Sequence, residues 1–164
     1  MGAALFYHLV RSPAESLVPV LIEKALAQGW RVELRAGTEA RLARFDELLW
    51  LREGFLPHGR AGGPHDARQP VLLTLAGEGP AANAPACVIA LDGAAIEPGD
   101  CATLERACIL FDGSDPGAVA GARDQWRRLT AAGITAEYWS DAGGGWKRER
   151  VSKPAEGQGG GGPG

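Results

Sequence analysis

The chain has 164 residues, of which 45% are hydrophobic and 23% are charged, a composition typical of a globular domain. A chain of this length can bury a sufficient core without disulfides or a structural metal, which excludes the small cross-linked scaffolds. The 17 Lys and Arg against 20 Asp and Glu give a formal net charge of −3, which disfavours sequence-independent binding to a phosphate backbone. We therefore do not expect direct DNA binding as the main activity.

The lack of recognisable targeting signals and the spacing of the cysteines together predict a cytoplasmic protein. No apolar stretch approaches the roughly 20 residues of a membrane-spanning helix, and the first ten residues lack the basic start of a secretory signal. We expect no membrane association. Three cysteines at wide spacing, Cys87, Cys101 and Cys108, are typical of reduced thiols rather than of a disulfide or zinc framework.

The first half of the chain alternates strand and helix patterns. Residues 3–10 form an aromatic and aliphatic run typical of a buried strand, and residues 30–35 alternate as in a half-buried strand. Between them we expect a helix over residues 16–28, which places Pro19 in its first turn, with Gly29 as a left-handed cap. Thr38 can cap a second helix that runs to about Leu51, its apolar positions being Leu42, Phe45 and Leu49.

The second half continues this alternation after a long loop, residues 52–68, which we expect to be ordered. Interior strands are predicted at 71–75, 87–91 and 107–111, a helix from the Asp115 cap to Gly133, a strand at 134–139, and a short edge segment after 143–146. Such alternation predicts an α/β domain with parallel pairing. From Val151 onward the sequence predicts a disordered Gly-rich tail, so we divide the chain into a domain, 1–150, and a tail, 151–164.

Two sequence patterns resemble ligand sites, and each is weak evidence for one. Residues 77–82 (Gly-Glu-Gly-Pro-Ala-Ala) match a dinucleotide fingerprint, but Pro85 and the apolar run at 87 leave no room for the helix that must face the pyrophosphate. His58 and His65 share one loop, but their spacing favours packing over zinc binding. We find no P-loop and no nucleophile with a recognisable base, and so predict no nucleotide site, no cofactor, no metal and no enzymatic activity.

The last predicted helix offers a candidate recognition surface. Val119, Ala122, Trp126 and Leu129 would form its inward stripe, with Arg123 and Arg127 one turn apart at the edge. Guanidinium groups hold carboxylates bidentately while an indole packs an apolar anchor, an arrangement that suits an acidic peptide. The alternative is a core tryptophan flanked by solvated arginines. Trp50 and Phe55 carry the same two interpretations.

A set of landmarks in fixed order points to a known family. They are Phe6-Tyr7-His8-Leu9, Glu23-Lys24-Ala25-Leu26, Gly29-Trp30-Arg31-Val32, Phe45-Asp46-Glu47-Leu48-Leu49-Trp50, Phe55-Leu56-Pro57-His58-Gly59, Gln69-Pro70-Val71-Leu72-Leu73, Ile109-Leu110-Phe111-Asp112-Gly113, Ala122-Arg123-Asp124-Gln125-Trp126-Arg127, and residues 133–139. In this combined order, over about residues 1–150, the chain resembles the chi subunit of bacterial DNA polymerase III.

The resemblance implies a single Rossmann-like three-layer domain without a nucleotide site. It also implies a non-catalytic accessory subunit of the clamp loader in DNA replication, which binds the psi subunit on one surface and the acidic, aromatic C-terminal tail of single-stranded DNA-binding protein on another. Contact with DNA would then be indirect.

Residues that match the family's tail-binding positions are Trp50 and Phe55 as apolar contacts, Arg123 and Arg127 as carboxylate clamps, and Trp126 as the aromatic position. Val119 stands where some members have a basic residue, and Gly63 stands where an acidic residue is common; both departures predict weaker tail binding. Two alternatives from other classes remain: a Rossmann-like nucleotide-dependent enzyme, which nucleotide binding would support, and a structural α/β protein that acts by homo-oligomerisation.

Overall fold

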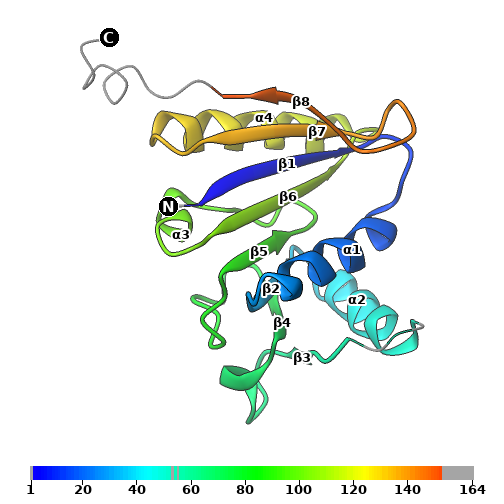
Figure 1. The fold of residues 1–164 in the computed structure, drawn as a ribbon, viewed down its shortest axis with the longest axis vertical. Coiled ribbons are helices and arrows are strands. Elements are labelled where there is room, and N and C mark those ends of the chain that lie inside the picture. Colours follow the sequence, from blue (N-terminus) through cyan, green and yellow to red (C-terminus); the bar gives the residue numbers. More distant parts are fainter. Residues whose placement is uncertain (1, 53, 55, 153–164) are drawn as a thin grey trace.

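The computed structural model describes residues 2–52, 54 and 56–152, which form strands alternating with helices (Figure 1). Its elements in chain order are β1 (Ala3–Leu9), α1 (Ala14–Ala27), β2 (Val32–Ala36), α2 (Glu39–Leu51), β3 (Gly59–Arg60), the 3-10 helix η1 (Asp66–Arg68), β4 (Val71–Leu75), β5 (Cys87–Ala90), α3 (Pro98–Cys101), β6 (Arg106–Asp112), α4 (Pro116–Ala131), β7 (Ala136–Ser140) and β8 (Lys147–Val151).

All eight of these strands join one sheet in the order β3-β4-β2-β5-β6-β1-β7-β8. Every neighbouring pair is parallel except β7 and β8, so β8 is an antiparallel edge strand. Helices α1 and α2 pack against one face, and α3 and α4 belong to the core of the other face (Figure 1). The predicted three-layer, Rossmann-like α/β fold with a mostly parallel sheet is confirmed.

Both faces of the sheet are covered, which corrects the expectation that β2 is half-buried. The polar residue Glu33 in β2 is only 2% exposed. Its carboxylate accepts hydrogen bonds from Arg35 Nε at 2.9 Å and from Thr74 Oγ1 at 2.6 Å. The alternating polar residues of β2 therefore face other protein segments rather than solvent, since Arg35 also donates to the Ala95 carbonyl and to Asp100 of α3. Their burial is tolerated because the charges are paired.

The predicted helix signals are mostly confirmed. Thr38 Oγ1 accepts from the Arg41 N–H at 3.2 Å at the start of α2, and the Asp115 carboxylate accepts from the Gly117 N–H at 2.9 Å at the start of α4. Gly29 and Gly133 follow α1 and α4 with φ of +81° and +86°, in the left-handed region that glycine adopts at little cost.

Helix α1 begins earlier than expected, at Ala14, so Pro19 lies inside the helix and not in its first turn. The preceding turn is fixed by Asp141, whose carboxylate accepts hydrogen bonds from the N–H groups of Val10, Arg11 and Ser12 at 2.8, 3.1 and 2.7 Å. This anchoring sets where the helix starts. The ring of Pro19 is buried, so its packing offsets the intrahelical hydrogen bond that proline cannot make.

The remaining differences concern short elements and the end of the domain. The predicted loop 52–68 contains β3 and η1, and α3 was not predicted because four residues give no helical period. The predicted edge segment is confirmed as β8. Val151 belongs to β8, and the Ser152 N–H donates to the Ala136 carbonyl at 2.7 Å, so the folded part extends past the predicted boundary at 150. Residues 153–164, the rest of the predicted tail, lie outside the described residues.

The three cysteines are free and buried, as predicted. Cys87 and Cys108 lie on the neighbouring strands β5 and β6, and Cys101 lies in α3. Among the described residues no helix combines the length and the apolar character needed to cross a bilayer.

Candidate functional site

The three predicted residues of the last helix line a groove between α4 and the neighbouring strands of the sheet. Arg123 and Arg127 are exposed one turn apart, and Trp126 between them is half-buried. The groove has a volume of about 500 Å³. We call it the α4 groove and define it by its lining residues, which come from β1, β6, α4, β7 and β8: Phe6, His8, Phe111, Val119, Ala122, Arg123, Trp126, Arg127, Thr130, Tyr138 and Arg150.

Aromatic rings form much of the α4 groove. The Phe6 ring lies 5.3 Å from the Trp126 ring at a tilt of 58°, and His8 stacks on Phe111 at 4.9 Å. His8 Nδ1 also contacts the Tyr138 hydroxyl. Because these rings come from three adjacent strands and a helix packed on them, the groove is formed on rigid elements rather than loops.

The charged residues that line the α4 groove are arginines. Arg150 on β8 places its guanidinium carbon 5.5 Å from the centre of the Trp126 ring, so it faces Arg123 and Arg127 across the groove from the sheet edge. None of the described residues that line the groove is acidic. Partial burial raises the pKa of Tyr138, which keeps its hydroxyl neutral near pH 7. Three guanidinium groups around an indole can hold carboxylates while an apolar side chain packs on the rings.

Sequence reasoning missed His8, Tyr138 and Arg150 as members of this site. Phe6 and His8 are two residues apart on β1 and therefore share a face, and register brings His8 beside Phe111. This neighbourhood depends on β1 lying between β6 and β7, which the chain order alone does not reveal. Arg150 follows a turn that the sequence only suggested. Val119 lies in the groove rather than in the buried stripe, while Gln125, which was not assigned to that stripe, is buried.

Trp50, the other predicted contact that the structure describes, does not join the α4 groove. It lies near the end of α2, with 57% of its surface exposed, beside the ring of His58 at 5.1 Å. Helix α2 covers the β4 and β2 part of the opposite sheet face (Figure 1). Trp50 and the three α4 residues, which the resemblance implies as positions of one tail-binding site, therefore belong to two surfaces. Phe55 lies outside the described residues.

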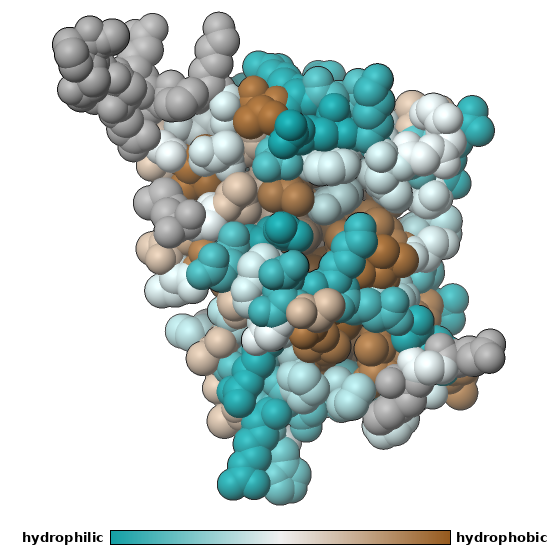
Figure 2. Space-filling model, in the orientation of Figure 1, coloured by the Kyte–Doolittle hydropathy of each residue, from teal (hydrophilic) through white to brown (hydrophobic). Residues whose placement is uncertain are grey.

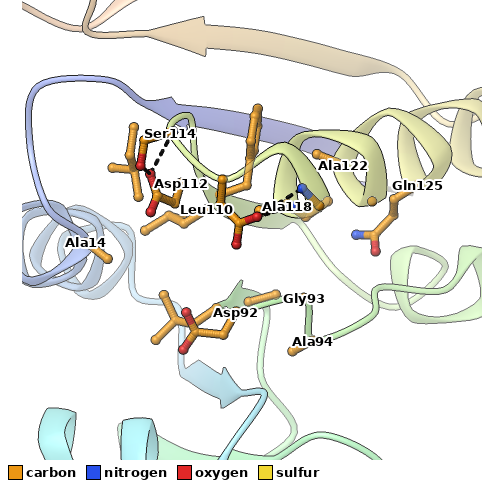
Figure 3. Close-up of a pocket in the computed structure, with 18 of the residues that line it drawn as sticks. Ala14, Asp92, Gly93, Ala94, Leu110, Asp112, Ser114, Ala118, Ala122 and Gln125 are labelled. Atoms are coloured by element: carbon orange, nitrogen blue, oxygen red, sulfur yellow. Dashed lines mark hydrogen bonds between the residues drawn. The ribbon is translucent and has the colours of Figure 1, made fainter.

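A second and larger cavity lies where nucleotides bind in related folds, at the carboxyl ends of the parallel strands. This carboxyl-edge crevice, of about 1040 Å³, lies between the N-terminal half of α4, the turn after β1 and the segment after β5 (Figure 3). The charged residues that line it are Arg11, Glu15, Arg41, Asp92, Asp112, Asp115, Asp124 and Arg128. Acidic groups prevail over basic ones, which disfavours a phosphate ligand.

The two weak ligand motifs, the 77–82 segment and the histidine pair, do not form ligand sites among the described residues. Residues 77–82 form turns that lead toward β5, and no helix follows them, so the fingerprint match is a loop as predicted. His58 is buried, with Nδ1 2.7 Å from the Leu56 carbonyl oxygen and Nε2 2.9 Å from an Asp46 carboxylate oxygen. Within the described ranges no group of three or more His, Cys, Asp or Glu residues could hold a metal ion.

These features define a Rossmann-like α/β domain whose cationic, aromatic groove lies on its last helix and edge strands. The family model described as DNA polymerase III chi subunit, HolC, matches residues 1–137. The chain therefore belongs to the chi subunit family, which gives it an accessory role in DNA polymerase III. No curated protein matches the chain.

Proposed function

We propose that this protein is a non-catalytic clamp-loader subunit that binds the C-terminal tail of single-stranded DNA-binding protein in the α4 groove. The observation that carries the proposal is the charge of the groove, where Arg123, Arg127 and Arg150 surround Trp126 and no lining residue is acidic. An acidic peptide with an aromatic side chain complements this arrangement. The partner that carries the tail, single-stranded DNA-binding protein, would then contact DNA, so the negative net charge of this chain is no obstacle.

Each part of the proposed tail has a counterpart in the groove. The arginines donate charge-assisted hydrogen bonds to the tail's carboxylates, and such bonds are stronger than neutral ones. The rings of Phe6 and Trp126 offer apolar surface to an aromatic anchor. Val119 replaces a basic residue of some family members, and Arg150 supplies a guanidinium group from the opposite wall.

The test is a titration of the protein with a fluorescent peptide that copies the tail, beside a scrambled peptide of equal charge. We expect saturable binding of the native sequence that weakens with salt, because exposed charges are screened. Arg127→Ala should weaken binding by about 1.5 to 3 kcal/mol, the range for hydrogen bonds to charged groups. The matched control is Arg128→Ala, since Arg128 is the next residue of α4 but contacts Glu97 at 3.1 Å, away from the groove. Equal effects of the two substitutions would remove Arg127 from the site.

We propose that the psi subunit binds the surface that carries Trp50. Trp50 is 57% and Leu51 75% exposed at the end of α2, and exposed tryptophan is characteristic of interface cores. Helix α2 covers the face opposite α4, so the two partners could bind together. Trp50→Ala should weaken capture of psi and leave the tail titration unchanged, whereas Arg44→Ala, an exposed change on the same helix, should alter neither. Loss of tail binding in Trp50→Ala would contradict this division.

The two alternative classes predict different results. A nucleotide-dependent enzyme would have to bind phosphates in the carboxyl-edge crevice, where the acidic side chains oppose them. Calorimetric titration with nucleotides tests that directly. A homo-oligomer would show a multiple of the 17.1 kDa chain mass in sedimentation or light scattering without any partner.

A further inference from the structure

The carboxyl-edge crevice adjoins the α4 groove, with which it shares Phe111 and Ala122, but its other lining residues of α4 are different. Its acidic and small residues come from three segments that meet at the ends of β1, β5 and β6 (Figure 3). The crevice is about twice as large as the groove, at 1040 against 500 Å³. A cavity of this size accommodates several residues of an extended peptide.

A buried amide without a partner points to a missing ligand. Gln125 is only 7% exposed, and its Nε2 makes no hydrogen bond to any described residue. The side chain projects from α4 into the gap above the Gly93–Ala94 segment (Figure 3). Because a buried donor that is left unpaired costs stability, this N–H group is placed to donate to an acceptor that enters the crevice, such as a carbonyl oxygen.

The charge of the crevice favours a cation beside that acceptor. Asp92 lies on one side and Asp112 lies on the other (Figure 3). Asp115, three residues after Asp112, also lines the crevice. Their hydrogen bonds with described residues use one oxygen each: Oδ2 of Asp92 binds Arg41, Oδ1 of Asp112 binds Ser114, and Oδ1 of Asp115 binds the first turn of α4. The second oxygen of each carboxylate is thus available to a ligand that donates hydrogen bonds.

The basic residues around the crevice do not cancel this charge. Arg41 also bonds Glu15 at 3.4 Å, Arg128 is shared by Glu97 and Asp124, and Arg11 Nε donates to the Ala142 carbonyl at 2.9 Å. Five acidic residues against three arginines line the walls. The N-terminal N–H groups of α4, which could otherwise attract an anion, already bind Asp115.

Small residues line the path between the charged wall and Gln125. Gly93 and Ala94 face Gly117, Ala118 and Gly121 of α4 across the crevice. A Cβ added at Gly93 or Gly121 would meet no atom within 4 Å, so open space lies beside both. A peptide backbone can therefore approach closely between these two segments.

We propose that the carboxyl-edge crevice binds an extended peptide segment that carries an arginine or lysine side chain. The cationic head lies between Asp92 and Asp112, and a backbone carbonyl of the same segment accepts a hydrogen bond from Gln125 Nε2. Neither contact involves the α4 groove, so this site is independent of the function proposed above. One helix thereby separates two peptide sites of opposite charge preference.

The experiment is a titration of the ¹⁵N-labelled full chain followed by NMR. The probe is the acetylated, amidated tripeptide Gly-Arg-Gly, compared with the same peptide containing citrulline and with agmatine, which lacks the carbonyl group. We expect saturable shifts of the Gln125 side-chain amide and the Gly93 and Gly121 N–H groups with the arginine peptide. Binding of citrulline peptide and agmatine should be at least about tenfold weaker, because each lacks one of the two required contacts. Equal affinities for all three, or shifts confined to the α4 groove, would overturn the proposal.

Two variants separate ligand binding from stability. Asp92→Asn keeps a residue type that tolerates the positive φ of +51° at this position, and should weaken peptide binding several-fold. Gln125→Leu removes the unpaired amide and should preserve or raise the melting temperature while it weakens binding. Glu47→Gln, an equal charge change at an exposed site on α2, is the control and should bind normally. Unchanged affinity in both Asp92→Asn and Gln125→Leu would refute the assignment.

Discussion

Replacing Asp141 by asparagine tests how the carboxyl edge of the sheet is held together. Asp141 is 1% exposed and follows β7, yet its two carboxylate oxygens accept N–H groups of Val10, Arg11 and Ser12, in the turn between β1 and α1. An asparagine has one oxygen in place of two, so at least one N–H group loses its acceptor and faces an amide donor. Because hydrogen bonds to a charged group contribute about 1.5 to 3 kcal/mol each, we expect a loss of about 2 to 4 kcal/mol in the free energy of unfolding.

The pH dependence of stability provides an independent check. The three backbone N–H groups outweigh the opposing effect of burial and lower the pKa of Asp141 from its usual 3.8 to about 2. The stabilisation is therefore fully present above about pH 4 and is lost as the pH falls toward 2, because the unfolded chain binds the proton first. Urea unfolding between pH 7 and pH 3 should show this decline in the native protein and a shallower one in Asp141→Asn.

At neutral pH the same substitution should lower the melting temperature by about 5 to 15 °C, since 1 kcal/mol corresponds to about 2 to 4 °C for a domain of this size. The control is Asp66→Asn, whose carboxylate also accepts backbone N–H groups, from Gly62 and Gly63, but within one exposed loop. Equal stability of Asp141→Asn and the native protein, or an unchanged acid response, would refute the reasoning.

Two further predictions concern the walls of the α4 groove. Arg150→Ala should weaken tail-peptide binding about 5- to 30-fold, with little change in melting temperature because the side chain is exposed. The control is Arg148→Ala on the same strand. Arg148 pairs with Trp139 and lies on the other face of the sheet, so this variant should bind the peptide normally in the same titration. Gly113→Ala should displace His8, since a Cβ there would come within 2.5 Å of the ring and 2.9 Å of the Leu9 carbonyl oxygen. We expect about 1 to 3 kcal/mol of destabilisation in chemical unfolding together with weaker tail binding, and normal values of both would contradict this account of the groove.

Local signals in the sequence predicted most of the regular elements. Thr38, Asp115 and Gly29 mark the ends of helices because their side chains or backbone conformations act on immediate neighbours. The start of α1 depends instead on Asp141, which is more than 120 residues away along the chain. Glu33 shows the same limit: its alternation with apolar residues is local, but its burial depends on segments far away in the sequence, such as Thr74 in β4.

The candidate site follows the same division. Arg123, Trp126 and Arg127 were identified because helical spacing places them together whatever the rest of the fold does. Their neighbours His8, Tyr138 and Arg150 lie on strands whose order in the sheet requires long-range pairing. Trp50 was joined to this set by family resemblance, but the topology places α2 on the other face. Site residues that lie together on one helix were therefore predictable, whereas the contacts between that helix and distant strands were not.

Strand β8 also determines how the sheet ends. An outermost strand presents unpaired backbone groups that another chain could extend, and proteins suppress this with charged side chains. All five residues of β8 are exposed, and three of them, Lys147, Arg148 and Arg150, are basic. Figure 2 shows the resulting hydrophilic surface over this end of the molecule. A second copy that paired antiparallel along β8 would bring these cations together, so the strand that completes the α4 groove also protects the sheet from growing into a fibre.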